Sequence, residues 1–147
     1  MNSYLDMLEK TGNSLMVYRD GDIVFQSSSK GIRPHLEAID SLGEGLRGTV
    51  MVDKIVGRAA ALLILYSGAV EAHAAVLSTQ GRRALEMHGL MFTYAEEVEH
   101  IKMLDGRIYC PFEAMVQGLT DPEEAYHAIV EKMKSLRNQD AIQSHVP

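Results

Sequence analysis

Three residues in this sequence could carry chemistry where helices are expected to begin: Asp53, Lys54 and Cys110. Asp53 and Lys54 follow a short apolar strand predicted at residues 50–52 and open an apolar helix predicted at residues 54–66. Free N–H groups and the positive end of the helix dipole make such a junction favourable for ligands. Lys54 could bind an anion or, if desolvated, form a Schiff base, with Asp53 orienting it. The alternative is that Asp53 only caps the helix and Lys54 is solvated.

Cys110 is the second candidate for catalysis. It precedes Pro111 at the start of a helix predicted over residues 110–119, where the dipole and free N–H groups lower the pKa of a thiol. A nucleophilic cysteine also needs a base nearby, and no histidine is linked to Cys110 locally in the sequence. The alternative is that Cys110 is a small buried side chain at a helix start.

Four further residues lie where a ligand at the strand ends could reach them. Gly57 favours close packing of the helix on the sheet, and Arg58 is expected to face either solvent or a ligand. Ser78 is a suitable N-cap for a helix predicted over residues 79–88. Arg33 could reach the same cleft from a third helix. The sequence contains neither a dinucleotide-binding nor a P-loop glycine pattern.

Composition narrows the class of protein. The net charge of −6 argues against binding to nucleic acid or to an anionic membrane, both of which select basic surfaces. The single cysteine excludes an intramolecular disulfide and a cysteine-based zinc site, and the histidines show no metal-ligand spacing. We therefore predict no metal and no cofactor. The sequence shows no secretory signal and no apolar segment long enough to span a membrane, which predicts a cytoplasmic protein.

The hydrophobic patterning predicts a single domain over residues 1–138 and a flexible tail over residues 139–147. A helix at residues 3–10 precedes a β-hairpin at 14–19 and 22–27, joined by Asp20-Gly21, which is a strong hairpin signal. A helix beginning at Arg33 leads into a β-α-β-α-β segment with strands at 50–52, 70–77 and 90–94, and two helices follow. This order predicts a three-layer α/β/α fold with a mixed sheet.

Several segments together resemble a bacterial and archaeal family of unknown function with a cytidine deaminase-like fold. They are the hairpin, residues 31–34 (GIRP), residues 52–63 (VDKIVGRAAALL) and Cys110-Pro111. Deaminases hold zinc with His or Cys at the starts of two successive helices and use a Glu to move protons. Neither helix start in this sequence carries those ligands. The resemblance therefore implies the fold without the zinc chemistry.

Three functions follow from these residues. The first is binding of a small molecule, nucleotide-like by analogy with the fold, near Asp53, Lys54, Gly57, Ser78 and Cys110. The second is an enzyme that uses Cys110 as nucleophile and Lys54 as its electrostatic partner. The third is a homodimeric interaction module without a small-molecule site. The residues leave open whether the protein is an enzyme.

Overall fold

The computed structural model describes residues 2–101 and 111–144. Helices and strands alternate through the middle of the chain, as the hydrophobic patterning predicts. In chain order the elements are α1 (Ser3–Thr11), β1 (Leu15–Arg19), β2 (Asp22–Ser27), α2 (Arg33–Leu42), the 3-10 helix η1 (Gly43–Leu46), β3 (Val50–Val56), α3 (Arg58–Ser67), β4 (Glu71–Ser78), α4 (Thr79–Met87), β5 (Met91–Val98), α5 (Pro111–Val116) and α6 (Pro122–Ser144).

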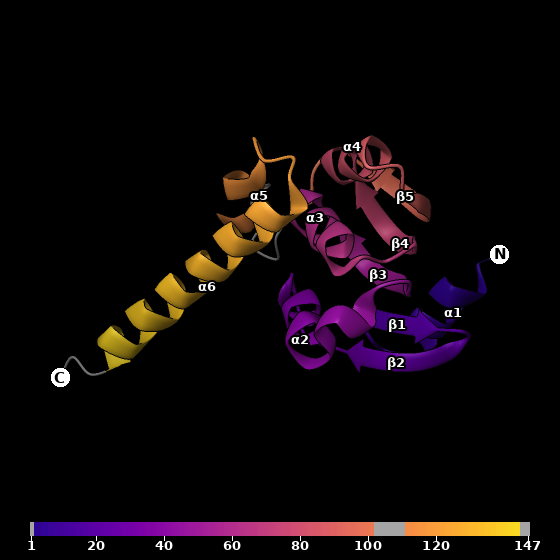
Figure 1. The fold of residues 1–147 in the computed structure, drawn as a ribbon, viewed down its shortest axis with the longest axis horizontal. Coiled ribbons are helices and arrows are strands. Elements are labelled where there is room, and N and C mark those ends of the chain that lie inside the picture. The colour runs from indigo at the N-terminus through magenta and orange to yellow at the C-terminus, as the bar shows by residue number, and fades with distance from the viewer. Residues whose placement is uncertain (1, 102–110, 145–147) are drawn as a thin grey trace.

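The strands form one mixed sheet in the order β2-β1-β3-β4-β5 (Figure 1). Strand β1 is antiparallel to β2 and to β3, whereas β4 is parallel to β3 and to β5. Right-handed crossovers through α3 and α4 place these two helices on the same face of the sheet, together with α2, which also contacts α3. We call this the helix face, and the opposite face, which α1 covers, the α1 face. The prediction of a three-layer α/β/α fold is confirmed.

The hairpin between β1 and β2 is confirmed at its turn. Asp20 and Gly21 both adopt positive φ angles, 52° and 86°. Two such residues match the twist of the flanking strands, and Asp-Gly is among the pairs that adopt this geometry most readily. The register between the strands then passes over Val24, so that β2 carries an irregularity at the outer edge of the sheet.

Helix α1 is fixed to its face of the sheet by a polar contact at its first residues. The side chain of Asn2 accepts hydrogen bonds from the backbone N–H groups of Tyr4 and Leu5, and its amide donates to Thr93 Oγ1 at 3.0 Å. The Tyr4 ring stacks on the ring of His73 on β4. Four buried side chains complete the contact between α1 and the sheet: Leu8, Met16, Tyr18 and Val52.

The main core, on the helix face, shows that the strands change face along their length. Met51 and Val56 of β3 both belong to this core, and so do Ala72 and Leu77 of β4. Each pair is separated by an odd number of positions, whereas side chains on one face of a regular strand are separated by even numbers. The alternation of side chains must therefore be interrupted between these residues.

The interruption lies at Lys54, Ala75 and Ala95. These three residues are not paired between β3, β4 and β5, although the residues before and after them are. On β5, Phe92 packs against the main core, and Glu97 forms an ion pair with Arg82 of α4 on the same face. We call this shared interruption the face reversal. Beyond it, the residues turned toward the α1 face are Ile55, Val76, Glu96 and Val98.

The face reversal explains why the predicted boundaries here are wrong. Strand β3 runs to Val56, and α3 begins at Arg58 with Gly57 as its N-cap. Asp53 and Lys54 are therefore strand residues and not the first turn of a helix. Strand β5 likewise extends to Val98, past the predicted end at residue 94. In each case polar residues at the break in alternation resemble the end of a strand.

The C-terminal helices pack against α3 (Figure 1). Helix α5 covers part of the helix predicted over residues 110–119, and Cys110 lies outside the described residues. Tyr126 of α6 stacks on Tyr66 of α3 with ring centres 4.1 Å apart. Helix α6 extends to Ser144, so residues 139–144, predicted to lie in the tail, continue the helix; favourable helix formers such as Gln143 allow this. Within the described residues, no helix is long and apolar enough to span a membrane.

Candidate functional site

The N-terminus of α3, where the sequence predicts ligand binding, already holds a carboxylate of the same chain. The backbone N–H of Arg58 donates to Glu113 Oε2 at 3.0 Å, and that of Ala59 donates to Glu113 Oε1 at 2.8 Å. Glu113 comes from α5 and meets the positive end of the α3 dipole. A Cβ atom on Gly57 would lie 2.6 Å from Glu113 Oε1, so glycine at this position makes the approach possible.

Burial sets the acidity of Glu113. Desolvation raises the pKa of its carboxyl group above the ordinary value of 4.5, because burial penalises the charged form. The hydrogen bonds from Ala59 and Arg58 and the charge of Arg58 act in the opposite direction and offset part of the rise. The folded structure thus holds a carboxyl group that takes up a proton more readily than it would in water.

The side chain of Arg58 completes this contact from the other direction. Its guanidinium is buried, contrary to the prediction that it faces solvent or a ligand. Its Nε donates to Val116 O at 3.1 Å, and its Nη2 donates to Leu119 O at 2.6 Å. These carbonyls lie at the end of α5 and just beyond it, where a cation is favourable. We call these bonds of Glu113 and Arg58 the α3–α5 contact.

The start of α4 is closed in a similar way. Ser78 is the N-cap of α4, as predicted, and its hydroxyl accepts a hydrogen bond from Gly81 N at 3.0 Å. A Cβ on Gly81 would lie 2.9 Å from the carbonyl oxygen of Val56. The first turn of α4 therefore packs directly on the backbone of the β3–α3 turn, next to the α3–α5 contact.

The remaining predicted residues do not gather around these helix starts. Asp53 is buried beneath α2, where its Oδ2 lies 2.5 Å from His35 Nε2, whereas Lys54 and Arg33 are exposed. Among the described residues, no ion pair or hydrogen bond involves the Lys54 ammonium, and no three His, Cys, Asp or Glu side chains converge as metal ligands do. Whether Cys110 shares a site with Lys54 stays a prediction.

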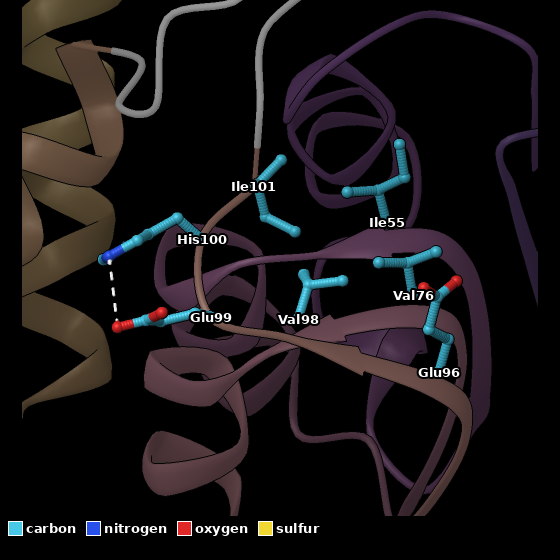
Figure 2. Close-up of a pocket in the computed structure, with 7 residues that line it drawn as sticks. All are labelled: Ile55, Val76, Glu96, Val98, Glu99, His100 and Ile101. Atoms are coloured by element: carbon cyan, nitrogen blue, oxygen red, sulfur yellow. Dashed lines mark ion pairs between the residues drawn. The ribbon is translucent and has the colours of Figure 1, made fainter.

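A hollow of about 540 Å³ lies at the carboxyl ends of β3, β4 and β5, on the α1 face. Figure 2 shows its lining residues. Ile55, Val76, Val98 and Ile101 point toward one another and form its apolar part. We call it the strand-end hollow. Among the described residues, the hollow is lined by Ile55, Val76, Glu96, Val98, Glu99, His100 and Ile101.

Charged side chains lie on both sides of this apolar group. Glu96 neighbours Val76 at one side, and the Glu99–His100 ion pair, 4.0 Å long, lies at the other (Figure 2). Ile55 is 45% exposed although it occupies a central strand. Open apolar surface at the carboxyl ends of parallel strands is where α/β proteins commonly bind ligands.

Sequence reasoning did not find the hollow or the role of His35. The available signal was the pair of β-branched residues Ile55 and Val56, which continues the strand beyond Asp53 and Lys54. His35 gives no signal, since its partner Asp53 is distant in sequence and stands where a ligand-site residue or a helix cap is expected.

These features define an α/β/α protein whose helix starts are closed by its own side chains and whose sheet is open at the strand ends. The chain belongs to the DUF1893 family, a domain of unknown function, whose family model matches residues 3–133. A crystal structure of a DUF1893 family protein from Thermotoga maritima, TM1506, is 33% identical, with a TM-score of 0.80 over 88% of this chain and 87% of that one. A comparison with curated proteins gives no match.

The raised pKa of Glu113 predicts a pH-dependent stability. The folded protein binds the Glu113 proton more tightly than the unfolded chain does. The stability that this proton provides is therefore fully present below pH 4.5, the ordinary pKa of the group. It declines as the pH rises through the raised pKa of the folded state. Glu113→Gln lacks this titration. We expect the free energy of unfolding of the wild type, relative to Glu113→Gln, to fall in urea titrations as the pH rises above 4.5. A difference that grows with pH would contradict this assignment.

Gly81→Ala tests the close approach of α4 to the β3–α3 turn. The added methyl meets a backbone carbonyl, which cannot move like a side chain, so we expect thermal unfolding to show a loss of about 1–3 kcal/mol. Gly118→Ala is the matched control, since its Cβ would meet nothing within 4 Å; we expect a change within about 0.5 kcal/mol. Equal effects of the two substitutions would show that the approach is not close.

Proposed function

We propose that this protein binds a small organic cation with an apolar body in the strand-end hollow. The observation that carries the proposal is the exposure of Ile55, Val76, Val98 and Ile101 toward one open volume, flanked by carboxylates. A volume of about 540 Å³ lies within the range that small-molecule sites occupy. The likeness of fold within the DUF1893 family supports the general class of α/β/α protein and does not assign a ligand.

The apolar part of the ligand follows from the branched aliphatic side chains. Ile55 and Val76 are paired across β3 and β4, and Val98 lies further along β5, so their methyl groups offer a surface for a flat ring. Covering such a surface gains about 25 cal/mol for each Å² removed from water. The hollow is open, which favours a ligand that keeps part of its surface in solvent.

The sign of the ligand's charge follows from the rim. Among the described lining residues, the ionisable side chains are Glu96, Glu99 and His100, and none is Lys or Arg. The net charge of −6 adds to the negative potential over the surface. An amine or amidine would meet Glu96 favourably, whereas a phosphate would be repelled. The hollow therefore disfavours the phosphorylated members of the nucleotide-like ligands that the fold analogy suggests.

Two rival functions stay predictions. A cysteine-dependent enzyme depends on Cys110, which lies outside the described residues. A homodimeric module would need a contact surface, and β5 is an edge strand with Tyr94 43% exposed. An open edge alone does not specify a second copy as its partner.

Benzamidine and benzoate provide the test, because they have similar shape and opposite charge. We expect benzamidine to shift the methyl resonances of Ile55, Val76 and Val98 in NMR titrations and to bind more tightly than benzoate. Ile55→Lys, which places a cation in the hollow, should weaken benzamidine binding about tenfold or more. Ile23→Lys is the matched control, since Ile23 is 46% exposed and Ile55 45%, and it should leave binding unchanged.

Two results would overturn the proposal. One is the absence of any shift at the hollow residues of the wild type with benzamidine. The other is an equal loss of affinity in Ile55→Lys and Ile23→Lys, which would place the binding site elsewhere.

A further inference from the structure

We propose that Asp53, held by His35, is a positioning residue that fixes the face reversal of β3 and so turns Ile55 into the strand-end hollow. The proposal deepens the proposed function, since the hollow would not form with Ile55 on the helix face. Its structural part, the control of Ile55 by Asp53, can be measured without a ligand.

Asp53 is the last residue of β3 before the reversal, and the pairing of β3 with β1 ends there. Leu15 pairs with Asp53, and the N–H of Lys54 donates to Ser14 O at 2.9 Å. The Asp53 side chain lies on the helix face, where it is 6% exposed. In a regular strand Ile55 would share that face. It lies on the opposite face, beside Val76.

The Asp53 carboxylate joins the backbone of β3 to the side chain of His35 on α2, with one oxygen for each. Its Oδ1 accepts from the backbone N–H of Ile55 at 3.3 Å, and its Oδ2 lies 2.5 Å from His35 Nε2. A carboxylate that binds the N–H two residues ahead is a local alternative to the strand's own pairing. This bond holds the backbone across Lys54 in the reversed geometry.

His35 fixes the carboxylate from α2. The histidine is 1% exposed, and its Nδ1 has no hydrogen-bond partner among the residues that the structure describes. A buried N–H without an acceptor is costly, so the ring nitrogen that faces Asp53, Nε2, is the one placed to donate. That bond leaves Oδ1 free to accept from Ile55. No other role for this buried pair follows from the described residues.

The proposal predicts a specific difference between three variants. His35→Leu with Asp53→Val removes both buried polar side chains together, so that only the backbone N–H of Ile55 loses its acceptor, and the double variant should fold. Asp53→Asn keeps an oxygen that can accept from Ile55, provided that its amide donates to His35 Nε2 and the histidine proton moves to Nδ1, which costs some stability. Thr49→Val is the control for general destabilisation, since it deletes a buried hydroxyl, 0% exposed, that lies immediately before β3 and makes a separate hydrogen bond to Leu46 O.

Amide hydrogen exchange of Ile55 and the nuclear Overhauser effect (NOE) between Ile55 and Val76 methyl groups are the readouts. In the double variant we expect Ile55 to exchange about tenfold faster than in Thr49→Val at matched stability, and the NOE to disappear. Asp53→Asn should keep both close to wild type. Benzamidine affinity should fall in the double variant and be retained in Asp53→Asn.

A double variant that keeps slow exchange and the NOE would overturn the proposal. If the double variant does not fold, Asp53→Asn decides: retention of both signals supports the acceptor role, and their loss contradicts it. If benzamidine does not bind the wild type, the proposed function fails, while the exchange and NOE measurements still decide the role of Asp53.

Discussion

The sheet of this protein depends on one constraint: β3, β4 and β5 reverse their side-chain alternation together, in register. A reversal on one strand alone would bring unlike faces side by side and break the ladder. Lys54, Ala75 and Ala95 stand at equivalent positions on the three neighbouring strands. Because the pairing is interrupted at all three, it resumes in the same register beyond them. The same strands can therefore pack Met51 and Val56 against the helices and still expose Ile55 at the strand ends.

The contact between α3 and α5 occupies the helix start at which α/β proteins usually bind a ligand. In many α/β proteins the free N–H groups at a helix start await an anionic ligand. In this protein the Glu113 carboxylate accepts hydrogen bonds from the first backbone N–H groups of α3. The Arg58 side chain in turn donates to a carbonyl oxygen just beyond the end of α5. The two helices neutralise each other's dipole ends, at the cost of a buried carboxyl group. The helix starts at this edge of the sheet are therefore occupied by side chains of the same chain, and the open hollow lies on the opposite face.

Local signals predicted much of the fold. Asp20-Gly21 specified the hairpin, Ser78 the start of α4, and the order of apolar segments the three layers. What the sequence could not reveal depends on contacts distant along the chain, such as Asp53 with His35 and Arg58 with Glu113. Asp53 and Lys54 were read as a helix start because two polar residues after an apolar strand usually end it. The strand continues because Asp53 is satisfied by α2. The deaminase-like likeness stays a prediction.

The most direct test of this account is a methyl NOE experiment on the unmodified protein. The face reversal predicts cross-peaks between the methyl groups of Ile55 and Val76, which are paired across the two strands, and none from Ile55 to the core leucines of α3. It also predicts that Val56 and Leu77 show cross-peaks to that core. Cross-peaks from Ile55 to the α3 leucines, with Val56 turned to the opposite face, would contradict the account.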